Sequence, residues 1–206
     1  MKIDRARAQK AFADYAAHYN AADAKVKLKI DHTYRVAALC ARIAQSLALP
    51  PEDVDLAWLS GILHDVGRFE QLRRYNTFID AQSVSHAALS VAVLFDEGRI
   101  RDYLDDAGAD ALLRTAVEWH SAFRLPEALD DRTRLFCQIL RDADKIDILR
   151  QRRDTDGGNL QRQHRGAAPE PGDARRAGRL LRPPLRAAQL KAVPRRQRRR
   201  PCVACV

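Results

Sequence analysis

The sequence predicts an all-α protein, a compact helical bundle, and three observations support this prediction. Apolar residues recur at intervals of three and four along most of the first 150 residues, which is the period of one helix face. No segment shows the alternating pattern of a half-buried strand, and no internal repeat is present. Hydrophobic residues make up 46% of the chain, which is enough for one ordinary domain to form a core.

Three helices are expected in the N-terminal third of the chain. Residues 2–20 have the pattern of an amphipathic helix, and residues 25–48 have that of a second one. Two consecutive prolines then interrupt the pattern, and Pro51 is suited to the first turn of a new helix. We expect this third helix to contain the apolar run before His64 and to end near Gly67.

The later elements are shorter and are separated by breaker residues. Residues 68–80 have weak periodicity and are predicted to be a loop with some helical turn, a setting in which substrate contacts are expected. Further helices are predicted at 83–95, 100–104, 110–120 and from 131 to about 150. The last of these should turn its apolar stripe inward, namely Leu135, Phe136, Ile139, Leu140, Ala143 and Ile146.

Two different kinds of sequence meet near residue 150. Residues 151–206 hold 15 Lys and Arg against 4 Asp and Glu, whereas residues 1–150 hold 21 against 23. The net charge of +9 therefore belongs to the tail, which also contains no aromatic residue. A stretch rich in Arg, Pro and Gly buries too little apolar surface to offset its chain entropy. We predict a helical domain at 1–150 and a basic, disordered tail at 151–206.

The tail allows three interpretations. Its cluster at 195–200 can bind phosphate backbones, but it lacks interleaved aromatic residues, so nucleic acid is expected as a partner only through this tail, if at all. The C-x-x-C motif at 202–205 has no second pair, which argues against a zinc or redox site. The tail's composition, rich in Arg, Ala, Pro and Gly and without aromatic residues, is also what out-of-frame translation of a GC-rich gene gives, so a frameshift near residues 151–157 is a third hypothesis. Translation of the DNA in all three frames tests this, and it should reveal a helical, aromatic-containing continuation.

Cysteine usage and hydropathy indicate a cytoplasmic protein. Cys40 and Cys137 lie in apolar helical patterns, as expected for core residues in a reducing compartment. No stretch approaches the roughly 18 uninterrupted apolar residues of a membrane span, and the N-terminus lacks the apolar core of a signal peptide. The oligomeric state is left open.

The segment from Leu59 to Phe69 contains the pair His64 and Asp65, which predicts a metal site. Apolar residues at helical spacing place this pair on or beside a buried face. A buried imidazole and a buried carboxylate are costly unless they are paired, hydrogen-bonded or bound to a metal. Because successive helix residues point about 100° apart, both side chains can reach one divalent cation.

Other potential ligands occur on separate predicted helices, as metal sites in helix bundles require. The histidines are His32, His86 and His120. Near the end of the last helix, Asp147 lies at least as close to the apolar face as Asp144, so helical periodicity does not select between these two carboxylates.

The order of these residues resembles the HD-domain superfamily of metal-dependent phosphohydrolases over roughly residues 25–150. The pattern consists of His32, His64-Asp65, His86, His120 and Asp144, with the strings His64-Asp-Val-Gly-Arg68 and Asp142-Ala-Asp-Lys-Ile-Asp147. The resemblance implies a helical bundle with one metal held by His32, His64, Asp65 and Asp144.

The resemblance also leaves one part of the site open. In binuclear members two further histidines hold a second metal, and His86 and His120 match those positions, with Asp65 bridging. The same two histidines can instead bind phosphate or donate protons beside a single metal. Asp147 would accept a hydrogen bond from a ligand histidine.

The activity implied by this resemblance is hydrolysis of a phosphoester or phosphoanhydride. The substrate would be a nucleotide or another small phosphorylated metabolite. Mixed imidazole and carboxylate donors suit Mn, Fe, Co, Ni or Zn better than Ca, with one or two ions per chain. Such a metal, held by Asp65, activates a water molecule for attack on the phosphorus of the substrate. Arg68 is expected to hold a phosphate oxygen through its planar guanidinium, and Lys145 to do so less directionally.

Two other functions stay open at this point. A diiron oxygenase chemistry occurs on a related helical scaffold, and iron dependence with oxygen consumption would identify it. Alternatively, the chain is a non-catalytic or inactive truncated metal-binding domain, which would fold and bind metal without turnover.

Overall fold

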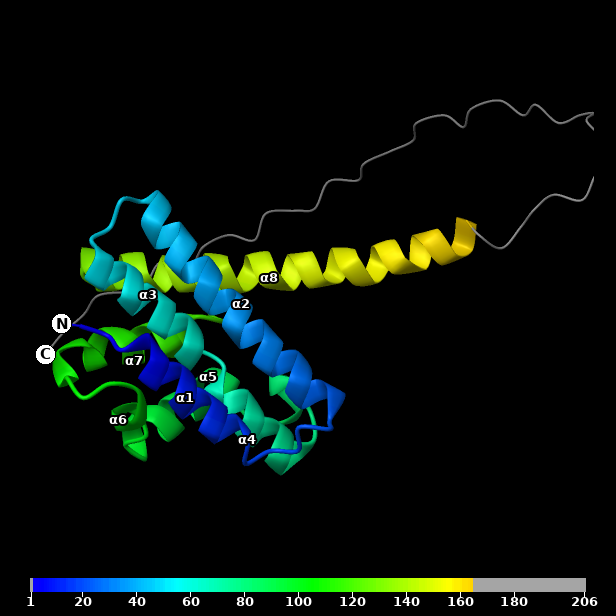
Figure 1. Cartoon of the computed structure of the whole chain (residues 1–206), viewed down its shortest axis with the longest axis horizontal. Coiled ribbons are helices and arrows are strands. Elements are labelled where there is room, and N and C mark those ends of the chain that lie inside the picture. The colour runs from blue at the N-terminus through cyan, green and yellow to red at the C-terminus, as the bar shows by residue number, and fades with distance from the viewer. Residues whose placement is uncertain (1, 165–206) are drawn as a thin grey trace, which may run out of the picture. The chain divides into compact units, whose positions relative to one another are not determined.

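The computed structural model describes residues 2–164, and this part of the chain contains eight α-helices and no β-strand (Figure 1). The all-α prediction is therefore confirmed. The helices are α1 (Arg5–Ala16), α2 (Ala24–Ser46), α3 (Pro51–Leu63), α4 (Val66–Tyr75), α5 (His86–Val91), α6 (Ile100–Tyr103), α7 (Asp110–Trp119) and α8 (Asp131–His164). Short 3-10 turns occupy η1 (Asp80–Gln82) and η3 (Ala107–Ala109), and a π-helical segment, η2 (Ala92–Asp96), follows α5.

Local signals fix the starts of the first three helices. Asp4 and Asp23 cap α1 and α2, because their side chains accept hydrogen bonds from free backbone N–H groups of the first turn. Helix α3 begins at Pro51, as predicted. The negative charges of Glu52 and Asp53 in its first turn interact favourably with the positive end of the helix dipole.

Gly61 allows α3 to lie very close to α2. A Cβ atom at this position would lie 2.5 Å from the Cα atom of Ala37, so only glycine fits between the two backbones. This close approach brings the helix that contains His32 against the helix that ends before His64.

The predicted C-terminal end of the third helix is wrong. Helix α3 ends at Leu63 rather than near Gly67, and Asp65 has the non-helical φ and ψ angles of −107° and 16°. The segment after it, predicted as a loop, is mostly helix α4. The α4 helix buries Val66, Phe69 and Leu72 at helical spacing, a stripe that the many charged residues around it obscure in the sequence.

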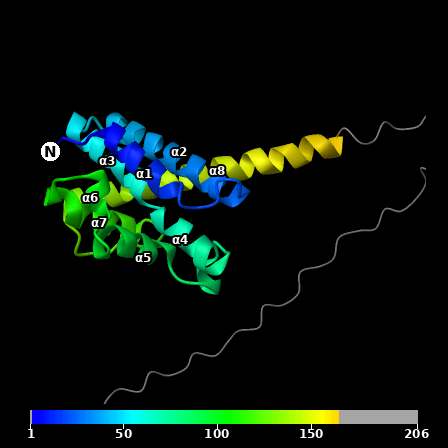
Figure 2. The ribbon, with the colours of Figure 1, turned by 60° about the horizontal axis from the view of Figure 1, so that its bottom comes forward.

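Two groups of helices meet at the α3–α4 junction. Figure 2 shows α1, α2 and α3 together on one side and α4 to α7 on the other. Contacts within the groups join α2 to α3, α4 to α5 and α5 to α7, and α8 contacts α2, α3 and α7. The junction at His64 and Asp65 therefore lies where residues from both groups can converge.

Helix α8 differs from its prediction in length and in one face residue. It begins at Asp131 as expected but continues to His164, past the predicted end near residue 150. Arg and Gln are good helix formers, and extending a helix needs no new nucleation step. Ile146, predicted to face inward, is 46% exposed, because the polar side chain of Asp147 occupies the position toward α2.

The remaining predictions for the tail, including its disorder beyond residue 164, the basic cluster and the C-x-x-C motif, fall outside the described residues. The domain boundary near residue 150 stays a prediction. Cys40 and Cys137 are buried, as predicted for core residues. None of the helices within residues 2–164 combines the length and apolar character that a membrane crossing requires.

Candidate metal centre

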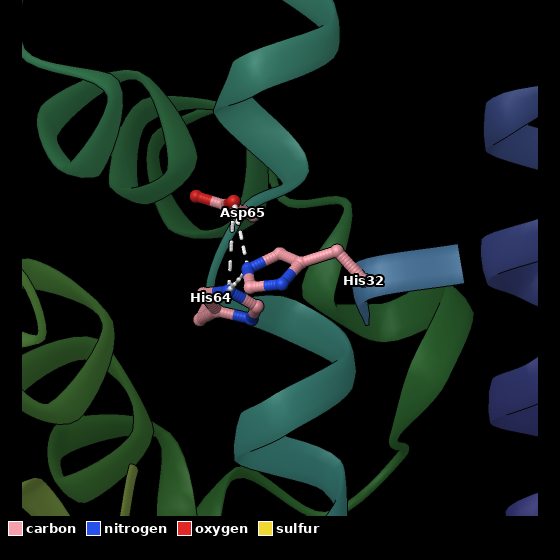
Figure 3. A group of neighbouring side chains, drawn as sticks. All are labelled: His32, His64 and Asp65. Atoms are coloured by element: carbon pink, nitrogen blue, oxygen red, sulfur yellow. Dashed lines mark hydrogen bonds and ion pairs between the residues drawn. The ribbon is translucent and has the colours of Figure 1, made fainter. Parts of the chain in front are cut away.

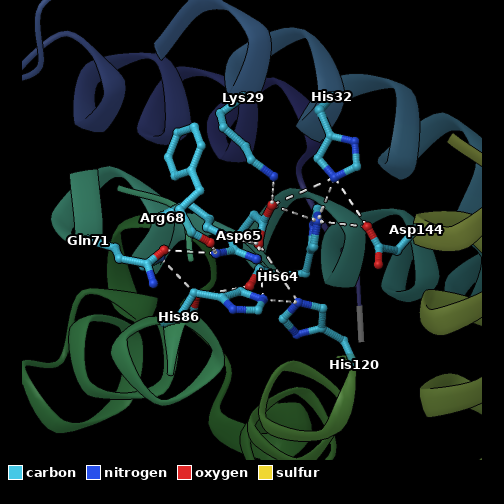
Figure 4. A network of polar contacts seen from close by, with 12 residues as sticks. Lys29, His32, His64, Asp65, Arg68, Gln71, His86, His120 and Asp144 are labelled. Carbon is cyan, nitrogen blue, oxygen red and sulfur yellow. Dashed lines mark hydrogen bonds and ion pairs between the residues drawn. The ribbon is translucent and has the colours of Figure 1, made fainter. Parts of the chain in front are cut away.

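Six side chains from six different helices or helix ends converge at the α3–α4 junction (Figure 4). All six are buried, and they are His32 on α2, His64 and Asp65 at the junction, His86 on α5, His120 at the end of α7, and Asp144 on α8. The structure thus brings together every residue that the sequence proposed as a metal ligand.

The first group consists of His32, His64 and Asp65 (Figure 3). The Nε2 atoms of His32 and His64 lie 3.6 and 3.5 Å from Oδ2 of Asp65, and 3.4 Å from each other. On the α8 side, Oδ1 of Asp144 lies 3.2 Å from His32 Nε2 and 4.0 Å from His64 Nε2. Four donor atoms therefore surround one small volume.

The second group consists of Asp65, His86 and His120. Here the Nε2 atoms of the two histidines lie 3.1 Å apart, and they are 3.7 and 3.8 Å from Oδ1 of Asp65. Asp65 therefore presents one carboxylate oxygen to each pair of histidines, which is the arrangement of a bridging ligand.

The outer nitrogen of every histidine is already engaged. Nδ1 of His32 and of His86 donates to the carboxylates of Asp147 and Asp80, at 2.7 and 2.6 Å. Nδ1 of His64 and of His120 donates to the backbone carbonyls of Gly61 and Val117, both at 2.7 Å. These hydrogen bonds fix the tautomer that leaves the Nε2 lone pair free on all four rings.

This donor set fits divalent transition metals. Two neutral imidazoles whose Nε2 lone pairs face each other at 3.1 or 3.4 Å repel unless a cation lies between them. Imidazole nitrogens combined with carboxylate oxygens are the ligands that Mn, Fe, Co, Ni and Zn accept.

The protonation states suit metal binding at neutral pH. Burial lowers the pKa of His86 and of His120 to about 4, and it also lowers the pKa of His64. Burial acts to raise the pKa of Asp65, but nearby positive charge, to which Lys29 contributes most, outweighs it and holds this pKa well below its usual range. His64, His86 and His120 are thus neutral at this pH, and Asp65 is ionised.

Sequence reasoning missed two residues of this centre. Lys29 places its Nζ 2.7 Å from Oδ2 of Asp65, and a signal was available, since Lys29 precedes His32 by three residues and lies on the same helix face. Asp80 orients His86, but the sequence analysis placed it in the predicted loop at 68–80 and gave this residue no role.

Arg68 and Lys145, the predicted phosphate-binding residues, both lie at the centre. Nη1 of Arg68 donates to Gln71 within α4, and to Asp80 and the carbonyl of Phe78, so this nitrogen ties the segment after α4 to the helix. Its buried Nε lies 3.6 Å from Oδ1 of Asp65 and has no hydrogen-bond partner within residues 2–164. Lys145 is more open to solvent and donates to Asp144 at 2.9 Å.

Asp147 and Asp144 take different positions around His32. Asp144 lies on the Nε2 side of the ring, with the other potential ligands, whereas Asp147 accepts the hydrogen bond from Nδ1 and also contacts Arg35 and Gln151. Burial acts to raise the pKa of Asp147, but the hydrogen bonds from Arg35, His32 and Gln151 lower it below its usual value.

Comparison with known proteins supplies one match. A family model described as the HD domain matches residues 30–149, which include every residue of both histidine groups. No curated protein and no solved structure matches the chain. The match covers more than half of the sequence, and the buried His and Asp groups it contains can bind metal. The chain belongs to the HD-domain family.

Proposed function

We propose that this chain is a metal-dependent phosphohydrolase of the cytoplasm that acts on a nucleotide or another small phosphorylated metabolite. HD domains typically have this activity. The observation that supports it best is the position of Asp65, which turns one oxygen toward each of two buried histidine pairs. A centre of this kind suits the handling of a charged phosphoryl group, because it can concentrate positive charge in a buried place.

We propose that His32, His64, Asp65 and Asp144 hold one divalent metal, and that Asp65, His86 and His120 hold a second. Bound there, such an ion would lower the pKa of a water molecule and polarise a phosphoryl oxygen. The chain itself keeps the four imidazoles in the required tautomer through Asp147, Asp80 and two backbone carbonyls.

The basic residues divide their roles in this proposal. Lys145 is 55% exposed, so it can meet the phosphate of an arriving substrate from the solvent side of Asp144. Arg68 is 15% exposed and acts mainly by fixing Asp80, which in turn orients His86, while its Nε lies 3.6 Å from Oδ1 of Asp65.

The proposal is tested by measuring metal content by elemental mass spectrometry and phosphatase activity on the same samples. We expect one or two metals per chain in the wild type and none in Asp65→Ala, because Asp65 is shared by both groups. Loss of several kcal/mol of transition-state stabilisation should lower hydrolysis by roughly 10³-fold or more. Asp14→Ala, which alters an exposed carboxylate on α1, should leave both quantities unchanged.

Other outcomes identify the alternatives. Iron-dependent oxygen consumption without phosphate release would indicate an oxygenase on this scaffold. Stoichiometric metal without turnover of any phosphorylated substrate would indicate a non-catalytic metal-binding domain. A folded wild-type protein that binds no metal would contradict the proposal, and His64 and Asp65 would then be a structural pair.

A further inference from the structure

Lys29 is a partly buried cation that points into the centre from α2. Figure 4 shows its side chain directed at Asp65 from the same helix as His32. Its Nζ lies 2.7 Å from Oδ2 of Asp65, and the side chain is 15% exposed. The ammonium also lies 5.6 Å from the ring centroid of Phe78, within the range of a cation–π contact. Asp65 at the α3–α4 junction and Phe78 after α4 therefore both hold the ammonium group of Lys29 in place.

Lys29 differs from the other cations of the centre in how its donors are used. Nη1 of Arg68 is committed to three partners on and after α4. Lys145 is more than half exposed, and among the described residues it contacts one potential ligand, Asp144. The ammonium of Lys29 has three N–H groups, and the hydrogen bond to Asp65 engages one of them.

The position of Lys29 relative to the first histidine group defines what it can bind. The oxygen that it contacts, Oδ2 of Asp65, is the one that lies 3.6 and 3.5 Å from the Nε2 atoms of His32 and His64. An anion that approaches these donors therefore also approaches the ammonium group. Because the site is buried, a charge-assisted hydrogen bond made there is stronger than one at the surface.

We propose that Lys29 binds a non-bridging oxygen of the substrate's phosphoryl group, while its hydrogen bond to Oδ2 also orients Asp65. This inference deepens the proposed function and rests on it. It makes Lys29 the phosphate-binding residue of the buried side of the centre, whereas Lys145 serves the solvent side.

The test uses inorganic phosphate as the probe and the metal-loaded full chain. Phosphate affinity is measured by isothermal titration calorimetry for the wild type, Lys29→Met, Lys29→Arg and the control Lys27→Met, which alters an exposed residue on the same helix. We expect Lys29→Met to weaken phosphate binding on the order of 10- to 100-fold. Lys29→Arg should restore part of the affinity, and Lys27→Met should match the wild type.

A second measurement needs no variant and covers the case in which Lys29→Met does not fold. The wild-type protein, loaded with metal, is treated with an acetylating reagent with and without phosphate, and modified lysines are identified by mass spectrometry. Phosphate should protect Lys29 and leave Lys27 equally reactive.

The outcomes separate this inference from the proposed function. Unchanged phosphate affinity in folded, metal-loaded Lys29→Met, or acetylation of Lys29 that phosphate does not reduce, would overturn the role of Lys29 alone. A wild-type protein that binds metal but no phosphate would also overturn it. Failure of the wild type to bind metal would remove both proposals together.

Discussion

The centre contains two pairs of histidines, His32 with His64 and His86 with His120. Both pairs direct Nε2 atoms toward Asp65, but different residues hold their rings in place. Asp144 adds a fourth donor to the first pair, whereas Asp65 is the one carboxylate that the described part of the chain offers to the Nε2 atoms of the second pair. The carboxylate that orients His32 is fully buried, whereas the side chain of Asp80, which orients His86, is 39% exposed. From this difference we predict that, of the two proposed metal sites, the first binds its ion more tightly and the second exchanges its ion more readily.

The supporting elements explain this difference. Asp147 lies on the long helix α8 and is held by Arg35 from α2, so both partners belong to regular helices. Asp80 lies in the short turn η1 after α4, and Arg68 and Gln71 hold it there. None of the three residues of η1 is buried, so we expect this turn to open more easily than a packed helix.

The largest expected effect on metal content and hydrolysis comes from two separate variants, each of which removes one histidine from one pair. His32→Ala should remove the tighter metal and lower hydrolysis by roughly 10³-fold, since several kcal/mol of charge stabilisation are lost. His86→Ala should remove only the weaker metal and retain the other. Metal titration of the two variants measures this, and equal losses in both would contradict the proposed difference between the sites.

Acidification tests the second pair without any substitution. The folded-state pKa of His86 and of His120 is about 4, below the ordinary 6.5, so the unfolded chain takes up protons first as the pH falls. Stability of the metal-free protein should therefore decrease from pH 6.5 toward pH 4, by up to roughly 3 kcal/mol per histidine.

Urea denaturation at several pH values, with chelator present, measures this loss. His120→Gln should reduce the pH dependence, whereas His18→Gln, at an exposed position, should keep it. A metal-free protein whose stability is constant between these pH values would refute the assignment of neutral, buried histidines.

The smallest of these effects concerns the orienting carboxylates. Replacement of the partner that fixes a ligand histidine typically lowers metal affinity by about 10- to 100-fold. Asp147→Asn should weaken the first site and Asp80→Asn the second, each leaving the other site near its wild-type affinity. Competition with a metal-binding dye gives both constants, and a loss at the opposite site would show that the two sites are not supported independently.

Much of the fold was predictable because helix periodicity is a local property. The apolar spacing located most of the helices, and Pro51 marked the start of α3. The end of α3 was not predictable, because nothing in the apolar pattern distinguishes a continuous helix from one that breaks at Asp65 and resumes at Val66. The inward position assigned to Ile146 failed because Asp147, tied to His32 and Arg35, occupies that side of α8.

The sequence by itself determined which chemical groups are available and in what order, since His64 and Asp65 are covalent neighbours and the other histidines lie on separate helices. Only the tertiary structure decided which atoms face one another. It placed Asp144 and Asp147 on opposite sides of the ring of His32, where periodicity allowed either, and it brought Lys29 to Asp65.

The sequence pattern does not determine these contacts, because a helix repeat defines the faces of one helix but not which helices pack together. That meeting depends on close backbone approaches between distant segments. A Cβ atom at Gly61 would lie 2.5 Å from Ala37, and one at Gly67 would lie 2.4 Å from the carbonyl oxygen of His86. These two contacts bring α3 onto α2 and α4 onto α5, and each acts through the neighbour's backbone, which the sequence pattern of a single helix does not encode.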